Sequence, residues 1–129
     1  MSFAHLTLPT QHVERTARFL EETLGYRRNP VPANTPVETV WLDIGDGCEM
    51  HVFYVEGFEA SAFEGEFGRH VAVYHPLEDF TALKQRLTDA GAEFIEPLRA
   101  TPHARLFFRE PVNGYVFEVI DQAKQRRTT

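Results

Sequence analysis

The sequence is poor in cysteine and has no long apolar run, and each of these absences excludes a class of protein. Cys48 is the only cysteine in 129 residues, so an internal disulfide framework is excluded. No segment approaches the roughly 18 to 20 consecutive apolar residues that a membrane-spanning helix needs. Residues 1–5 have neither the basic start nor the apolar stretch of a secretory signal. We therefore expect a cytoplasmic protein.

Positive charge is scarce as well. Lysine and arginine number 13 against 19 acidic residues, which gives a net charge of −6. This balance disfavours nucleic acid, whose binders concentrate positive charge. The one basic cluster, residues 124–127, is interpreted as a solvated tail. Eleven phenylalanines and one tryptophan are enough for a substantial core. We expect a small-molecule substrate, with neither nucleic acid nor a membrane as partner.

Apolar spacing predicts a strand, a helix and three further strands in the first half of the chain. Thr10 is the expected N-cap of the helix, and Gly25 is expected to end it. A turn at residues 45–47 separates the last two strands. The expected strands are residues 3–9, 26–31, 38–43 and 48–55.

The same order recurs in the second half. A helix is expected over residues 77–90, ended by Gly91, and a turn over residues 111–114. The expected strands are residues 69–74, 93–95, 105–108 and 115–120.

Spacing supports a true internal repeat. His5 and His51 are 46 residues apart, and His70 and Glu118 are 48 apart. In the first half 20 residues lead from the histidine to the helix-ending glycine, and in the second half 21 do. Agreement at several points in both halves is hard to obtain by chance. The predicted fold is α+β: two tandem βαβββ modules, residues 3–55 and 69–121, joined by a linker at 56–68 within a single domain of residues 1–129.

Strand alternation predicts where four polar side chains of the repeat point. Successive residues of a strand face opposite sides of its sheet. The branched aliphatic residues of each first strand are expected to pack under the helix, which leaves His5 and His70 on the opposite face. His51 and Glu118 occupy equivalent positions in the last strands. A curved mixed sheet with a pseudo-twofold axis brings all four to one cavity.

Three imidazoles and one carboxylate suit a borderline divalent ion such as Zn, Ni, Co, Fe or Mn. Four protein ligands in a six-coordinate shell leave two positions for water or substrate. A single strand histidine is more often structural, so the hypothesis depends on all four occupying equivalent positions. The other histidines, His12, His75 and His103, lie outside the pattern and are interpreted as surface residues, with His75 nearest the mouth of the site.

Four short motifs carry a resemblance to a known family: HLTL at 5–8, FLEETLGY at 19–26, GRHVAV at 68–73 and FFREPVNGYVFE at 107–118. In this order they resemble the vicinal oxygen chelate superfamily over residues 3–121. This superfamily includes glyoxalase I, methylmalonyl-CoA epimerase, extradiol dioxygenases and the fosfomycin- and bleomycin-resistance proteins. The resemblance implies a glyoxalase-like fold with four ligands at the ends of strands, which match His5, His51, His70 and Glu118 here.

The resemblance also implies an activity class. Enzymatic members bind two neighbouring oxygens of the substrate to the metal, so we expect a lyase or isomerase acting on a small oxygenated metabolite. Glu118 is the expected general base and His51 a ligand or second base, while Thr7 and Tyr74 would orient the substrate. The ligand equivalent to His51 is commonly Glu or Gln in glyoxalase I, which argues against that enzyme itself.

Two other function classes remain open. One is a metal-dependent fosfomycin-type transferase or extradiol-type dioxygenase on the same scaffold. The other is a non-catalytic binding protein of the bleomycin-resistance kind, which would need no metal.

The linker suggests assembly. Residues 56–68 contain Phe58, Phe63 and Phe67, and exposed aromatic residues favour burial. They either fold back over their own core or cover a partner surface or the cavity mouth. We expect a homodimer with two metal sites.

Overall fold

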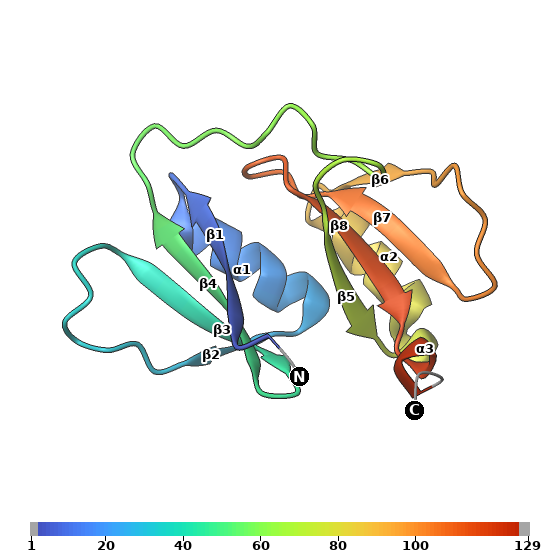
Figure 1. Cartoon of the computed structure of the whole chain (residues 1–129), viewed down its shortest axis with the longest axis horizontal. Coiled ribbons are helices and arrows are strands. Elements are labelled where there is room, and N and C mark those ends of the chain that lie inside the picture. The colour runs from blue at the N-terminus through green and yellow to red at the C-terminus, as the bar shows by residue number, and fades with distance from the viewer. Residues whose placement is uncertain (1–2, 127–129) are drawn as a thin grey trace. The chain divides into compact units, whose positions relative to one another are not determined.

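The computed structural model describes residues 3–126. The chain divides into two compact units, Met1–Glu59 and Ala60–Thr129, and each contains one copy of the repeat (Figure 1). The two predicted βαβββ modules are confirmed, each with its own four-stranded mixed sheet.

In the first unit the strand order is β1-β4-β3-β2. Its elements are β1 (His5–Thr10), α1 (Val13–Leu24), β2 (Arg27–Asn29), β3 (Thr39–Gly45) and β4 (Cys48–Tyr54). β4 lies at the centre, parallel to β1 and antiparallel to β3. This order places the last strand of the module between two neighbours that both contribute side chains to its polar face.

The second unit repeats this arrangement in the order β5-β8-β7-β6. Its elements are β5 (Val71–His75), η1 (Leu77–Asp79), α2 (Phe80–Asp89), β6 (Glu93–Ile95), β7 (Arg105–Arg109), β8 (Val116–Asp121) and α3 (Ala123–Arg126). β8 is parallel to β5 and antiparallel to β7. The helix expected over residues 77–90 begins with a 3₁₀ turn, and part of the expected solvated tail forms the short α3; Arg127 lies outside the described residues.

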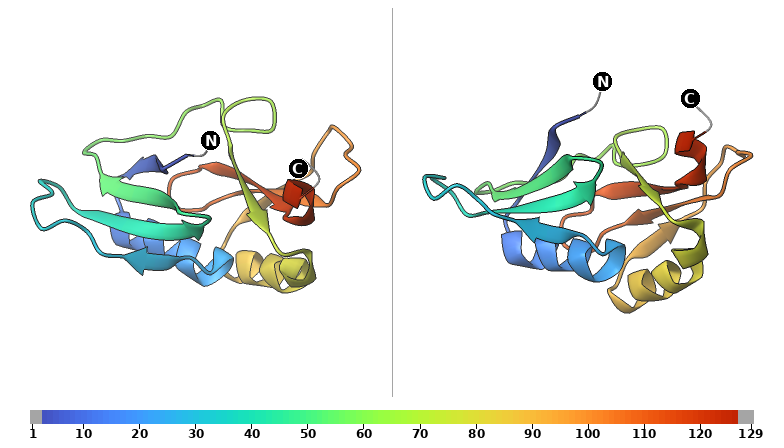
Figure 2. Two further views of the ribbon diagram at one scale, coloured as in Figure 1. Left: turned by 60° about the horizontal axis from the view of Figure 1, so that its bottom comes forward. Right: turned by 90° about the horizontal axis from the view of Figure 1, so that it is seen from below.

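Each sheet is covered by its own helix on one face, α1 on the first and α2 on the second (Figure 2). The covered faces form the cores. Leu8, Leu42, Met50 and Val52 are fully buried in the first unit, and Leu83, Leu87, Phe108 and Phe117 in the second. The opposite face of each sheet keeps the polar positions of the alternation, which is where the sequence places the candidate site.

The start of α1 differs from the prediction. The residue before the helix is His12, whose side chain makes no capping hydrogen bond, so Thr10 is not the N-cap. Thr10 is instead the last residue of β1, and its buried hydroxyl accepts a hydrogen bond of 2.9 Å from the His12 amide. Gly25 ends the helix as predicted, in the left-handed conformation at φ 79° that glycine adopts at low cost.

None of the helices within residues 3–126 combines the length and the apolar character needed to cross a membrane.

Candidate metal half-sites in the two units

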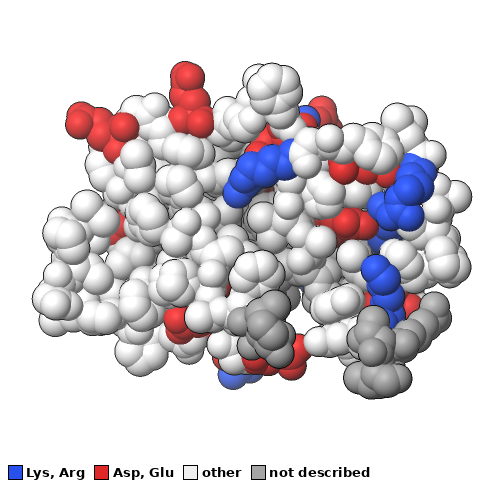
Figure 3. Space-filling view, in the orientation of Figure 1, with Lys and Arg blue, Asp and Glu red and all other residues white. Residues whose placement is uncertain are grey.

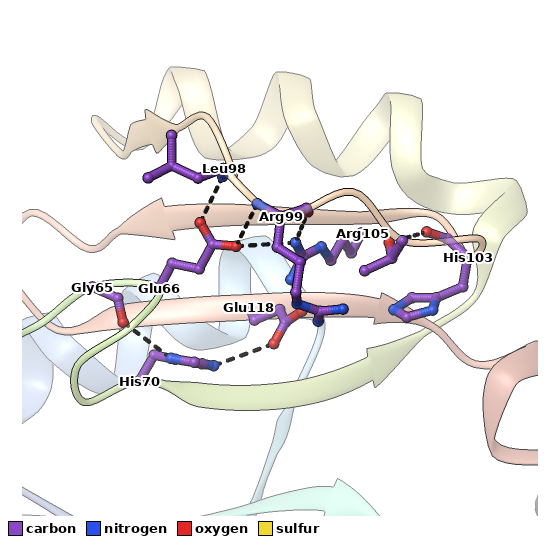
Figure 4. Close-up of polar contacts among 9 residues, drawn as sticks. Gly65, Glu66, His70, Leu98, Arg99, His103, Arg105 and Glu118 are labelled. Carbon is purple, nitrogen blue, oxygen red and sulfur yellow. Dashed lines mark hydrogen bonds and ion pairs between the residues drawn. The ribbon is translucent and has the colours of Figure 1, made fainter.

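In the second unit His70 and Glu118 face each other. Nε2 of His70 lies 3.2 Å from Oε1 of Glu118 (Figure 4). β5 and β8 pair in parallel with Ala72 opposite Glu118, and His70 precedes Ala72 by two residues, so it shares that face. The Glu118 side chain is 9% exposed and the His70 side chain 22%. This pair of predicted ligands is therefore brought together and is largely shielded from water.

A backbone carbonyl determines the tautomer of His70. Its Nδ1 lies 3.1 Å from the carbonyl oxygen of Gly65. A carbonyl oxygen only accepts hydrogen bonds, so Nδ1 carries the proton and, in the neutral ring, Nε2 is an acceptor. That acceptor faces the carboxylate oxygen of Glu118, and two acceptors this close repel each other unless a cation lies between them. The pair needs either a proton on Nε2 or a bound metal ion.

The second oxygen of Glu118 is held by Arg105, on the neighbouring strand β7. Nη1 of Arg105 donates to Oε2 of Glu118 at 3.0 Å, and Nη2 donates to Glu66 at 3.1 Å and to the carbonyl of Arg99. The Arg105 side chain is only 4% exposed. Arg105 therefore fixes the rotation of the Glu118 carboxylate and leaves Oε1 as the oxygen that faces His70.

Glu66 ties this group to the segment between β6 and β7. Its carboxylate accepts hydrogen bonds from the amides of Leu98, at 2.7 Å, and Arg99, at 3.2 Å. The hydrogen bond from the Leu98 amide has the largest effect on the pKa of Glu66 and lowers it. The hydrogen bonds from the Arg99 amide and from Arg105 lower this pKa further, while burial raises it. Glu66 thus remains a carboxylate that positions both the segment and Arg105.

The loop that presents Gly65 is held by two further contacts. Glu64 is buried and accepts hydrogen bonds from Arg69, at 2.8 Å, and from the amide of Val116, at 2.7 Å. Gly68 packs so closely that an added Cβ would lie 1.8 Å from the carbonyl oxygen of Phe63. These contacts use residue 69 in the loop, which explains why β5 begins at Val71 and not at the expected residue 69.

In the first unit the predicted ligands His5 and His51 are stacked. Their ring centroids lie 3.9 Å apart with an interplanar angle of 11°. Trp41 stacks on His51 at 3.9 Å and 3°. Because β1 and β3 flank β4 on opposite sides, His5 and Trp41 cover opposite faces of the His51 ring. The ring plane of His51 is therefore fixed, and only its edge is open to a ligand.

Glu49 occupies one nitrogen of that edge. Its Oε1 lies 2.9 Å from Nε2 of His51, and its Oε2 accepts a hydrogen bond of 2.7 Å from Asn29. The His51 contact and then the Asn29 contact lower the pKa of Glu49. The sequence placed Glu49 on the face of His51 by alternation, but it gave no reason to assign Glu49 a role.

The two predicted substrate contacts lie on the expected faces. Thr7 is exposed and pairs in register with His51, and Tyr74 is 44% exposed and pairs with Ile120, two residues beyond Glu118. Within residues 3–126 no group of three or more histidine, cysteine or acidic side chains lies close enough to hold a metal ion. The structure thus forms two pairs, His5 with His51 and His70 with Glu118, each inside one unit.

Two of the three remaining histidines are not the surface residues that we expected. His12 is exposed. His75 is buried and bonds to Asp79 at 2.7 Å, because it ends β5 on the helix-facing side. His103 is half-buried, its Nε2 is fully buried and has no hydrogen-bond partner among residues 3–126, and burial lowers its pKa. The expected strand ended at residue 74 and left His75 outside it, although His75 continues the face of Val71 and Val73, and no periodic pattern covers the loop of His103, so neither was expected to be buried.

Solved structures share this fold over nearly the whole chain. The fosfomycin resistance protein FosX from Mesorhizobium loti has a TM-score of 0.72 at 19% identity, covering 99% of this chain and 98% of its own. FosX from Listeria monocytogenes, solved with Mn(II) and a sulfate ion, has a TM-score of 0.72 at 13% identity, with coverage of 99% and 98%. A glyoxylase/bleomycin resistance protein/dioxygenase domain from Frankia sp. EAN1pec has a TM-score of 0.72 at 19% identity, with coverage of 93% and 90%.

No curated protein matches the sequence. The sequence does match a family over residues 2–119, and this match agrees with the repeated βαβββ architecture. The chain belongs to the Glyoxalase/Bleomycin resistance protein/Dioxygenase superfamily.

Proposed function

We propose that this chain is a divalent-metal-dependent lyase or isomerase that acts on a small oxygenated metabolite. The proposed metal ligands are His5, His51, His70 and Glu118, and the proposed metal is one of Zn, Ni, Co, Fe or Mn. We further propose that residues 1–129 form one domain and that the protein is cytoplasmic and dimeric.

One observation carries the proposal: the Gly65 carbonyl leaves Nε2 of His70 as an acceptor opposite Oε1 of Glu118, 3.2 Å away. Two donors on adjacent positions of one metal ion, at bonds of about 2.0 to 2.2 Å, lie roughly 3 Å apart. Metal-binding histidines commonly donate their other N–H to a backbone carbonyl or a carboxylate, which fixes the tautomer. The second unit has the donor types, the spacing and the orienting carbonyl that such an ion needs.

The first unit supplies a matching pair of imidazoles. Glu49 contacts Nε2 of His51 and would be the carboxylate that orients this ring, in the role that Gly65 has for His70. The stack of Trp41, His51 and His5 leaves the ring edges as the places for a ligand bond. We propose that the two pairs complete one coordination shell, either from one chain or across a dimer.

A bound divalent ion would act as a Lewis acid toward two neighbouring substrate oxygens. The remaining steps would be carried out by side chains of the protein. Glu118 is the proposed general base, because Arg105 holds one of its oxygens and leaves the other directed at the site. Thr7 and Tyr74 would orient the substrate from the same faces.

The second candidate is a fosfomycin-resistance function. FosX from Mesorhizobium loti and from Listeria monocytogenes resembles this chain in fold, and one Listeria structure contains Mn(II) and 1S,2S-dihydroxypropylphosphonic acid. A ³¹P NMR time course of fosfomycin with the purified protein and Mn(II) tests this candidate, and an unchanged spectrum would remove it.

Metal analysis of the purified protein tests the main proposal. One divalent ion per chain, removed by chelator and lost in a His70→Ala variant, is the expected result. Full retention of iron together with consumption of oxygen would favour the dioxygenase alternative. A protein that takes up no divalent metal but binds a bleomycin-type drug would overturn the enzymatic proposal.

A further inference from the structure

Two polar side chains near Glu118 have no partner within residues 3–126. Nε2 of His103 is buried and makes no hydrogen bond there. Arg99 uses its backbone amide and carbonyl with Glu66 and Arg105, but its guanidinium makes no hydrogen bond or ion pair with a described residue. Figure 4 shows both side chains on the side of the β7–β8 pair that carries Glu118. A buried polar nitrogen without a partner is costly, so a ligand or water is expected to contact it.

Three cationic side chains lie close enough to affect the ionisation of His103. The pKa of His103 is lowered first by burial and then by Lys124, Arg105 and Arg99, while Glu118 acts in the opposite direction. Arg105 pairs with both Glu118 and Glu66, whereas Arg99 and Lys124 form no ion pair with a residue of 3–126. In the space-filling view, blue cationic atoms flank red carboxylate atoms over the second unit (Figure 3). Two unneutralised cations beside a neutral donor favour a negatively charged ligand.

We propose that Arg99 and His103 form a binding site for an oxyanion, a carboxylate or a phosphate-like group, beside Glu118. The planar guanidinium of Arg99 can bind two oxygens of such a group, and Nε2 of neutral His103 can donate a hydrogen bond as the Nε2–H tautomer. Lys124 adds positive charge at longer range. A water molecule could satisfy His103 alone, but it would leave the charges of Arg99 and Lys124 uncompensated.

This site indicates that the substrate of the proposed enzyme carries an anionic group. Its relevance to turnover rests on the proposed function, because only a nearby reaction centre makes the anion part of a substrate. The metabolite would then have neighbouring oxygens for the metal and a carboxylate, phosphate or phosphonate for Arg99 and His103. The segment between β6 and β7 would select substrates by their charge, and Glu66 would hold that segment in place through Leu98 and Arg99.

The test uses the full chain without metal and follows the His103 ring protons by NMR during titration with inorganic phosphate. Chloride at equal ionic strength is the reference, and acetate and methylphosphonate titrations distinguish a carboxylate site from a phosphate or phosphonate site. We expect a saturable shift of the His103 signals with at least one oxyanion. Arg99→Gln should weaken binding about tenfold, the loss of one charge-assisted hydrogen-bond pair. Arg15→Gln on the exposed side of α1 is the matched control and should leave binding unchanged.

Equal effects of the Arg99 and Arg15 substitutions, or no response of His103 to any anion, would overturn the inference. Unfolding curves of each variant check that the fold is intact, and they should agree because the Arg99 side chain makes no hydrogen bond or ion pair with a residue of 3–126. Titration of the same samples with Mn(II) measures the metal separately. Anion binding without metal binding would reject the proposed function and keep this site, whereas metal binding without anion binding would do the reverse.

Discussion

His70 and Glu118 are 48 residues apart in the sequence, yet His70 Nε2 lies 3.2 Å from Glu118 Oε1. The parallel pairing of β5 with β8 places them side by side, the Gly65 carbonyl sets the tautomer of the histidine, and Arg105 sets the rotation of the carboxylate. The two side chains are thus each oriented by a separate group, and Arg105 also links Glu118 to Glu66. This orientation is the basis of the first two predictions.

Removal of His70 should abolish stabilisation by metal. A ligand that binds only the folded state at a hundred times its Kd adds about 2.7 kcal/mol to the free energy of unfolding. For a chain of this size that corresponds to a change in Tm on the order of 10 °C. We expect chelator to lower the Tm of the wild type by this order and to leave His70→Ala unchanged. Calorimetry with and without chelator measures it, and His12→Ala, at an exposed position, should behave as the wild type.

Loss of Arg105 should destabilise the second unit. Arg105→Met leaves the carboxylate of Glu118, which is 9% exposed, without its cation. Breaking a buried ion pair by removing one partner costs about 3 kcal/mol or more. Urea unfolding should show a loss of this size. The control is Arg18→Gln, whose 4.0 Å contact with Glu14 is exposed and should contribute less than about 1 kcal/mol.

A second measurement separates the charge from the packing of Arg105. In the double variant Arg105→Met, Glu118→Gln the carboxylate of Glu118 is removed, and Glu66 keeps its hydrogen bonds from the amides of Leu98 and Arg99, so we expect part of the lost stability to return. A double variant less stable than Arg105→Met would contradict the ion-pair explanation.

The repeat could be predicted from the sequence because it depends on periodicity and spacing. Both candidate pairs follow from two-residue alternation combined with the equivalence of the two modules, and the structure brings His5 next to His51 and His70 next to Glu118. The groups that orient them could not be predicted. Arg105 reaches Glu118 across 13 residues and Glu66 across 39, and such contacts depend on side-chain conformations that leave no periodic signal.

The same limit explains the errors at His75 and His103. Both lie at a strand end or in a loop, where the apolar pattern stops and burial depends on how the chain folds back. The Thr10 prediction failed for a related reason, because β1 extends one residue further than its apolar pattern and uses the threonine as its last member. Residues at the ends of helices and strands were therefore the hardest to place from the sequence.

Gly68 should be required for the loop that presents Gly65. An added Cβ at residue 68 would lie 1.8 Å from the backbone oxygen of Phe63, so Gly68→Ala must displace the backbone. We expect a loss of about 1 to 3 kcal/mol in the free energy of unfolding, typical of forced backbone strain, and weaker metal binding because the carbonyl of Gly65 moves. Gly65→Ala is the matched control, since nothing lies within 4 Å of its added Cβ. Equal Mn(II) affinity in the two variants would contradict this role for the loop.

Acid stability should depend on Asp79. Hydrogen bonds from Arg86 and then His75 lower its pKa from 3.8 to about 2. A carboxyl group with a depressed folded-state pKa stabilises the fold above its unfolded pKa and loses that contribution as the pH falls through the folded value. The contribution should therefore disappear between about pH 4 and pH 2. Urea unfolding across this range should show a shallower decline for Asp79→Asn than for the wild type. Parallel declines would exclude this pair as a source of acid sensitivity.

Assembly is the remaining prediction, and it depends on an exposed apolar patch formed by Phe63, Phe67 and Leu98. Their exposed fractions are 79%, 72% and 85%, so the two phenylalanines do not fold back over their own core. The hydrogen bond between Glu66 and the Leu98 amide keeps the two segments of the patch together. We expect a homodimer that buries this patch, with a mass by light scattering of twice 14.8 kDa at micromolar concentration.

Substitution of both phenylalanines tests the surface directly. Each buried phenylalanine contributes about 1.5 to 3 kcal/mol, so Phe63→Ser, Phe67→Ser should raise the dimer Kd at least a hundredfold and give a monomer. Val37→Ser, at a 44% exposed apolar position in the first unit, should leave the mass unchanged. A wild-type mass near 14.8 kDa would reject the dimer, and a double variant that stays dimeric would place the interface elsewhere. Phe63 and Phe67 flank Gly65, whose carbonyl orients His70. If the partner chain supplies metal ligands, dissociation of the dimer should also lower the Mn(II) affinity. If each chain holds its own metal, the affinity should stay unchanged.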